Sequence, residues 1–171
     1  MLAEERPIHV IYPSIASLRL GRALGILYES VPIRIGRIKL SHLLFPLPTS
    51  PLAAILYLAL KAGGKLHYVT TRRLYTARAL RKQPAGKMPL GEIPLDDIGR
   101  IDILRTLGHR FFRAGDLVIR DHQGLERMRL EGVTQPEMAR QTIFDARNAL
   151  MQTEAAHRII AARETSGVPA A

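Results

Sequence analysis

The chain has 171 residues, which is enough for one domain and an appendage. Its apolar fraction of 47% is typical of a folded or membrane-attached protein and argues against a disordered one. The lack of cysteine excludes disulfides, thiolate zinc sites and thiol catalysis. The net charge of +10 indicates a negatively charged partner, such as anionic lipid, nucleic acid or an acidic protein face.

We expect no cleavable leader at the start of the given sequence. Glu4 and Glu5 follow the first residues, whereas a signal peptide starts with positive charge and continues into a clean apolar run. We therefore expect residues 1–63, which hold two apolar stretches, to form a membrane-associated or docking segment with helical structure.

The first apolar stretch, residues 8–36, is amphipathic. Arg19 and Arg22 interrupt its apolar residues, so a position in the membrane interface suits it better than a span. Gly21 and Gly25 match the small-xxx-small pattern of close helix contact.

The second apolar stretch, residues 40–62, contains three prolines. We expect Pro46 and Pro48 to lie outside any regular helix, and residues 51–62 to form a helix about 18 Å long, short of a bilayer core of roughly 30 Å. The stretch fits a kinked span, a re-entrant element, a helix docked in a partner complex, or a buried helix of a soluble core. The expected docking residues are the apolar side chains of both stretches: Leu18, Leu24, Leu27, Leu43, Leu44, Phe45, Leu52, Ile55, Leu56 and Leu58.

After residue 64 the hydrophobic pattern changes to a period of two, which predicts short strands. A capping-box pair, Thr134 and Glu137, with Pro136 in the first turn predicts a helix from there to about Ala162. The fold class is therefore α+β: a small antiparallel β-barrel or sandwich over residues 64–163, closed by a C-terminal helix, with residues 164–171 as a flexible tail. The expected strands cover residues 66–74, 87–95, 100–107, 116–121 and 127–131, and residues 75–80 form either a continuation of the first strand or a second strand.

A dense basic patch begins about ten residues after the second apolar stretch, and no acidic residue lies between Gly64 and Gly91. Basic residues in this position mark the cytoplasmic side of a membrane segment and attract anionic head groups. The patch is equally compatible with a solvated face that pairs with scattered acids. Nucleic acid is not expected as a partner, because only Tyr68 and Tyr75 accompany the patch as aromatic residues. The patch comprises Arg72, Arg73, Arg78, Arg81, Lys82 and Lys87.

Motifs for catalysis are lacking in the sequence. It has no phosphate-binding loop, no dinucleotide fingerprint and no nucleophile elbow, and its six histidines never fall at metal-ligand spacing. The pairs Asp96–Asp97 and Asp121–His122 fit turns or strand ends better than a site. We expect no enzyme activity, no cofactor and no metal.

Several segments of the chain together resemble a bacterial PH-like domain that follows membrane segments in a large family of bacterial membrane proteins. The segments are His67–Leu74, Ile93–Ile98, Ala114–Ile119 and the approach through Gly132, Val133 and Pro136 to the last helix. The resemblance covers about residues 64–150. It implies a seven-stranded, highly bent sheet capped at one open end by the C-terminal helix. A member of this family assists the assembly of photosynthetic complexes.

These expectations lead to two hypotheses of function. The first is a non-catalytic accessory or assembly subunit of a bacterial membrane protein complex, with a photosynthetic complex as one candidate. It docks by residues 1–63 on the inner membrane and holds the PH-like domain on the cytoplasmic side. The alternative is a peripheral sensor of anionic lipid head groups that uses the basic patch of residues 72–87.

Overall fold

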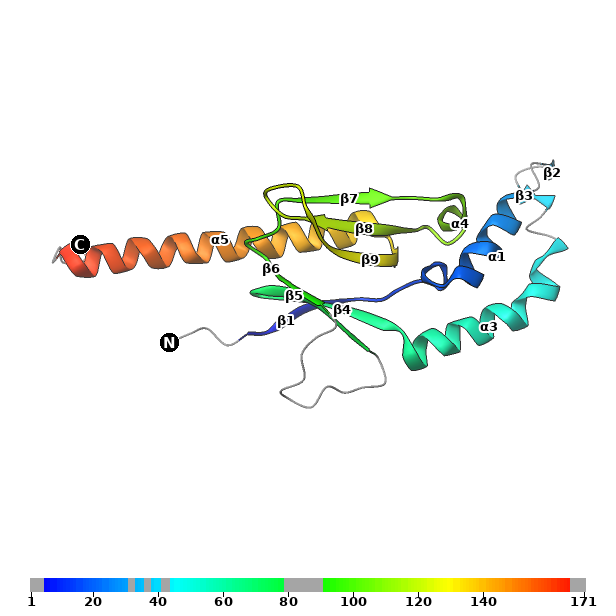
Figure 1. Ribbon diagram of the computed structural model, residues 1–171, viewed down its shortest axis with the longest axis horizontal. Helices are drawn as coiled ribbons and strands as arrows, with labels where there is room; N and C mark the ends of the chain where they lie inside the picture. Colours follow the sequence, from blue (N-terminus) through cyan, green and yellow to red (C-terminus); the bar gives the residue numbers. More distant parts are fainter. Residues whose placement is uncertain (1–4, 31–32, 36–37, 41–43, 79–90, 167–171) are drawn as a thin grey trace.

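The computed structural model describes residues 5–30, 33–35, 38–40, 44–78 and 91–166 (Figure 1). The fold is α+β, with two antiparallel sheets and a C-terminal helix, which confirms the expected class at this level. A helical part extends from one end of the β-domain, and the C-terminal helix extends from the other (Figure 1).

The first sheet has the strand order β1-β4-β5-β6, and every neighbouring pair is antiparallel. Its edge strand β1 comes from the first 63 residues and pairs with β4, with Ile11 opposite His67. The expected division at residue 63 therefore does not follow the fold, because the N-terminal segment supplies a strand of the β-domain as well as helices. The strands are β1 (Pro7–Ile11), β4 (Lys65–Thr70), β5 (Arg73–Arg78) and β6 (Gly91–Pro94).

The chain reverses between β4 and β5, where a continuous strand over residues 66–74 was expected. The Thr70 hydroxyl stabilises this turn: it accepts from the backbone N–H of Arg73 at 3.0 Å and donates to the Arg73 carbonyl at 2.7 Å. A threonine side chain that bonds to nearby backbone competes with continued strand pairing. The expected strand over residues 87–95 is confirmed only as β6, since residues 79–90 lie outside the described part of the chain.

The second sheet has the order β7-β8-β9 and is also antiparallel. Its strands correspond to three expected strands, with shifted ends. The alternation that predicted β9 holds, since Met128 and Leu130 are buried and Arg129 between them is exposed. A short helix, α4 (Leu107–Arg110), joins β7 to β8, and a separate two-stranded ladder joins β2 (Arg34–Ile35) to β3 (Ile38–Lys39). The sheet comprises β7 (Arg100–Leu104), β8 (Ala114–Arg120) and β9 (Glu126–Thr134).

The C-terminal helix, α5 (Pro136–Ser166), closes the core and then continues beyond it. Ala139, Ile143 and Ala146 are buried in the core together with residues of both sheets. Residues 151–163 are exposed on every face and extend from the domain (Figure 1). The helix therefore runs past the expected end at Ala162 and into the segment expected to be a flexible tail.

Two α-helices and a 3-10 turn form what we call the α1–α3 lobe. It comprises η1 (Ile15–Ser17), α1 (Arg19–Ser30) and α3 (Pro46–Gly63). Tyr28 joins α1 to α3, because its hydroxyl lies 2.5 Å from the Thr49 hydroxyl of α3. Its ring stacks at 4.1 Å between centroids on Phe111, directly after α4, and so attaches the lobe to the β-domain side of the fold. Among the described residues, none of the helices has the length and apolarity needed to cross a membrane.

Helix α3 begins at Pro46, five residues before the expected start. The first turn of a helix has no carbonyl partners for its N–H groups, so Pro46 and Pro48 remove no hydrogen bond there. Pro51 lies inside the helix. The expectation that the first two prolines exclude a regular helix was wrong, and α3 has 18 residues, about 27 Å at the helical rise.

The lobe joins the second sheet at Gly132 of β9. The Gly132 N–H donates to the buried Asp116 carboxylate at 2.7 Å, and the Gly132 carbonyl accepts from the N–H of Ser14 at 2.7 Å. Gly132 has φ of +59°, and a Cβ there would lie 2.3 Å from the backbone nitrogen of Ser17. Only glycine fits this position, where the backbone of β9 touches η1.

The glycine pair of α1 makes close backbone contacts, as the small-xxx-small pattern predicted. A Cβ on Gly25 would lie 2.2 Å from the carbonyl oxygen of Gly108 in α4, and one on Gly21 would lie 1.9 Å from that of Ile15. The absence of side chains at these positions allows α1 to pack directly on α4 and η1.

We predict that Gly25→Ala destabilises the protein by about 1–3 kcal/mol, because the added methyl must push α1 away from α4. Gly63→Ala is the matched control, since a Cβ there meets nothing within 4 Å. Urea unfolding of both variants measures the difference. Equal stability of the two variants would show that α1 does not pack on α4 through Gly25.

Candidate docking surface and adjoining pocket

Helix α3 is apolar over most of its circumference, with Thr49, Ser50 and Lys61 as its polar side chains, but the described chain covers only one stripe of it. Leu56 is buried and Thr49, Ala53 and Leu60 are half-buried, at helical spacing. The opposite side, which we call the outer face of α3, is exposed, and Leu47 reaches 86% exposure. The outer face comprises Leu47, Leu52, Ile55, Tyr57 and Leu58.

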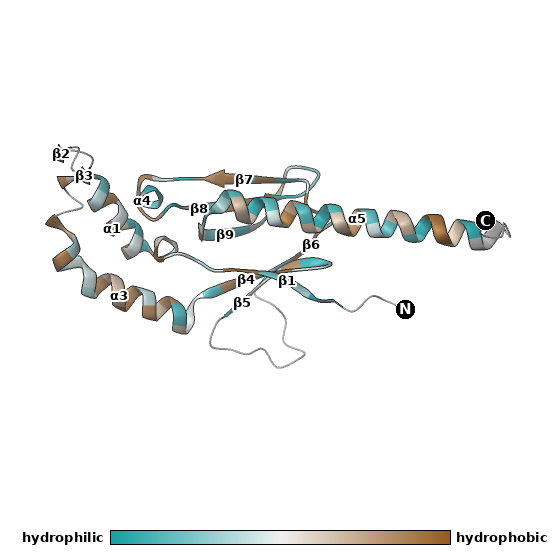
Figure 2. Ribbon diagram, turned by 180° about the vertical axis from the view of Figure 1, so that it is seen from behind, coloured by the Kyte–Doolittle hydropathy of each residue, from teal (hydrophilic) through white to brown (hydrophobic). Residues whose placement is uncertain are grey.

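Single exposed apolar residues are common on protein surfaces, but the outer face of α3 carries several exposed leucine and isoleucine side chains together. A helix that is apolar on all sides is normally buried, either in a protein core or in a membrane. In Figure 2, α3 is mostly brown and white, whereas much of α5 is teal. The outer face therefore has the character of a contact surface for a partner or a bilayer.

The structure separates the expected docking residues by exposure. Leu24 and Leu56 are buried at 7% exposure, so they stabilise the lobe and do not reach its surface. Leu18 and Phe45 are half-buried, and Leu43 lies outside the described residues. The exposed members are Leu27, Leu44, Leu52, Ile55 and Leu58.

The expected basic patch does not form one cluster within the described residues. Arg73 donates to Glu5 at 2.8 and 2.9 Å and to Glu92 at 2.8 Å, and its hydrogen bond lowers the pKa of Glu5. Arg72 and Arg78 are exposed but lie at opposite ends of β5, roughly 20 Å apart at the rise of a strand. The other members of the patch lie outside the described residues: Arg81, Lys82 and Lys87.

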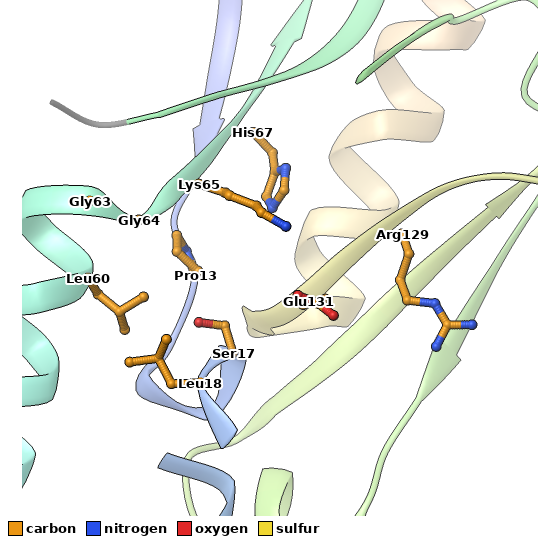
Figure 3. Close-up of a pocket in the computed structure, with 10 residues that line it drawn as sticks. All are labelled: Pro13, Ser17, Leu18, Leu60, Gly63, Gly64, Lys65, His67, Arg129 and Glu131. Atoms are coloured by element: carbon orange, nitrogen blue, oxygen red, sulfur yellow. The ribbon is translucent and has the colours of Figure 1, made fainter. Parts of the chain in front are cut away.

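A pocket of about 180 Å³ lies where α3 ends and β4 begins (Figure 3). Four parts of the chain meet there: the end of α3, the start of β4, the middle of β9 and the η1 region. We call it the β4–β9 pocket. Its lining residues are Pro13, Ser17, Leu18, Leu60, Gly63, Gly64, Lys65, His67, Arg129 and Glu131.

The β4–β9 pocket carries side chains of both charges. Lys65 of β4 and Glu131 of β9 both line it, and within the described part of the chain neither forms an ion pair. Arg129 differs, because its guanidinium is held by Glu126 at 2.9 Å and points away from the other side chains in Figure 3. Among the described residues, Lys65 and Glu131 thus have no ion-pair partner and are available to a ligand in the pocket.

His67 lies against the same pocket and is only 3% exposed. Its Nδ1 lies 2.8 Å from the Thr76 hydroxyl, and among the described residues its Nε2 has no hydrogen-bond partner. Burial, together with the nearby charge of Lys65, lowers the pKa of His67 to about 4. The imidazole is therefore neutral at physiological pH.

Sequence reasoning missed the pocket, because its side chains come from elements separated by more than a hundred residues. Lys65 and His67 point to one face of β4, as their spacing of two requires, but this spacing alone does not predict a partner on β9.

The turn expected at Asp121 is confirmed, since its carboxylate accepts from the N–H groups of Gln123 and Leu125 at 2.9 Å.

Comparison of the chain with protein-family models, curated proteins and solved structures finds no match. The likeness to the PH-like domain family remains an expectation from the sequence. Any hypothesis of function must therefore be argued from the outer face of α3 and from the β4–β9 pocket.

We predict that the free energy of unfolding decreases by about 3 kcal/mol between pH 6.5 and pH 4 through His67 alone. The unfolded histidine binds a proton below its ordinary pKa of 6.5, whereas the folded one does so only near 4, so acid favours unfolding in this window. Well below pH 4, where the folded and the unfolded histidine both hold the proton, this contribution no longer changes with pH.

The measurement is urea unfolding from pH 4 to 7 of the wild type, His67→Gln and His157→Gln. His67→Gln should lose this part of the pH dependence, and His157→Gln, at an exposed position on α5, should keep it. An identical pH dependence in all three proteins would contradict the assignment to His67.

Proposed function

We propose that this protein is a non-catalytic accessory or assembly subunit of a bacterial membrane protein complex, and that it docks through the outer face of α3. The observation that carries the proposal is a predominantly apolar helix of which the described part of the chain covers a single stripe. Full burial of a leucine or isoleucine side chain contributes about 1.5–3 kcal/mol, so the outer face offers several such contributions to a partner.

The charge around α3 favours a partner at a membrane. Residues 30–91 contain no acidic side chain, and Lys61, Lys65 and Arg78 are exposed at or beyond the C-terminal end of α3. Lys65 and Arg78 are register partners in the first sheet, so these two cations lie side by side. Cations beside an apolar surface suit the anionic cytoplasmic face of the inner membrane.

The arrangement of strands supports the proposed PH-like fold of the β-domain. The two sheets together hold seven strands, and α5 packs on the core that they share, as the resemblance implies. In this proposal β1 is the first strand of the domain, and the docking lobe is inserted between β1 and β4. A photosynthetic complex is one candidate partner, on the basis of the resemblance alone.

A peripheral sensor of anionic lipid head groups is the second candidate function. The exposure of Arg72 and Arg78 favours it, whereas the pairing of Arg73 with two carboxylates weakens the patch. Salt distinguishes the two functions. A head-group sensor leaves anionic vesicles as ionic strength rises, and a subunit held by apolar contacts needs detergent for release.

The test is purification in gentle detergent from native membranes, with mass spectrometry of the recovered proteins. We predict that the wild type is recovered in fixed stoichiometry with one integral membrane complex. The double variant Ile55→Asp and Leu58→Asp should lose at least about 90% of that recovery, because two carboxylates would then be buried against the partner.

The matched control is the double variant Met151→Asp and Ile159→Asp, which changes two similarly exposed apolar side chains on α5. It should retain the complex. Circular dichroism of both variants reports whether the β-domain stays folded. Equal recovery of the complex with both variants, or recovery of the wild type without any membrane protein, would contradict docking through α3.

A further inference from the structure

We infer that the β4–β9 pocket binds the head group of an aminophospholipid, which carries a negative phosphate and a positive primary amine. The inference rests on the proposed docking of α3, since that docking brings the C-terminal end of the helix to the bilayer surface. The pocket lies at this end, between Gly63–Gly64 and the strand β9.

The charges of the pocket match a ligand that carries both signs. Lys65 supplies an ammonium for the phosphate, and Glu131 supplies a carboxylate for the amine. Within the described chain both side chains lack an ionic partner, so neither must give up an existing pair to bind. A purely anionic head group would meet the negative charge of Glu131, which disfavours it.

The uncharged polar groups of the pocket are compatible with the same ligand. His67 is nearly fully buried, and its Nε2 has no partner among the described residues. A neutral imidazole offers either an N–H to the phosphate or a lone pair to the amine, depending on its tautomer. The Ser17 hydroxyl lines the pocket between Leu18 and Glu131 (Figure 3) and offers a further donor.

The size and the apolar side of the pocket indicate how the rest of the lipid lies. A volume of about 180 Å³ is below the roughly 300–1,000 Å³ of pockets for drug-sized ligands, so a head group fits and acyl chains do not. Leu60 of α3 and Leu18 line the side of the pocket nearest the helix (Figure 3). The acyl chains would leave the pocket on this side, past Leu60 and Leu18, toward the bilayer.

The first experiment uses a soluble head group and does not depend on membrane docking. Glycerophosphoethanolamine is titrated into the full chain and followed by ¹H–¹⁵N NMR. We expect saturable shifts confined to the amides around the pocket, and binding at least about tenfold weaker in Glu131→Gln, which loses one charge-assisted hydrogen bond. Glu154→Gln, an exposed carboxylate on α5, should bind as the wild type does.

Glycerophosphocholine is the matched ligand control, because its quaternary ammonium has no N–H to donate to Glu131. We expect it to bind at least about tenfold more weakly. Absence of saturable shifts, or equal binding of both head groups, would overturn the inference. Equal affinity of Glu131→Gln and the wild type would overturn it as well.

Vesicles identify the source of the head group. We expect several-fold more wild-type protein to float with phosphatidylcholine vesicles that contain phosphatidylethanolamine than with phosphatidylcholine alone. Binding of the soluble head group without this preference would overturn the assignment to lipid and point to a free phosphoamine. Recovery of the membrane complex with the Ile55→Asp and Leu58→Asp double variant tests docking separately. A failure of head-group binding would therefore leave the proposed docking function untouched.

Discussion

The contact between Gly132 and the η1 turn fixes the α1–α3 lobe on the β-domain. The buried Asp116 carboxylate accepts the Gly132 N–H, and Nε2 of the buried His109 in α4 lies 3.5 Å from the same carboxylate. Because α4 packs on Gly25 of α1, this cluster ties the second sheet, η1 and α1 together. The direction in which α3 presents its outer face, and the walls of the β4–β9 pocket, both depend on it.

The local part of the fold was predictable from the sequence, and the long-range part was not. Alternation over residues 127–131 and the start of α5 are local signals, and both elements formed where they were expected. The sequence does not predict the pairing of β1 with β4, because the apolar residues of β1 run on into the amphipathic stretch of residues 8–36. The turn after Thr70 was missed since it depends on one side-chain hydroxyl within a run of strand-forming residues.

The docking segment was predictable as a region, but its exposed residues were not. A helix apolar on all sides gives no periodicity from which to choose a buried face, so Leu56 and the exposed Leu58 look alike in the sequence. Pairing of the basic residues with scattered acids was an open alternative, but the partner Glu5 of Arg73 lies 68 residues away and no local pattern identifies it. The opposite charges of Lys65 and Glu131 meet only through the fold, and no local pattern predicts such a pair.

Photo-crosslinking from Leu47 tests docking through α3 most directly. This side chain is 86% exposed on the outer face, and a photoreactive amino acid there would sit at the proposed contact. We predict that in living cells a photoreactive amino acid at position 47 crosslinks to an integral membrane protein. The same amino acid in place of Ile159 on α5 should not do so. Crosslinks from position 47 to soluble proteins alone, or no more than from position 159, would contradict it.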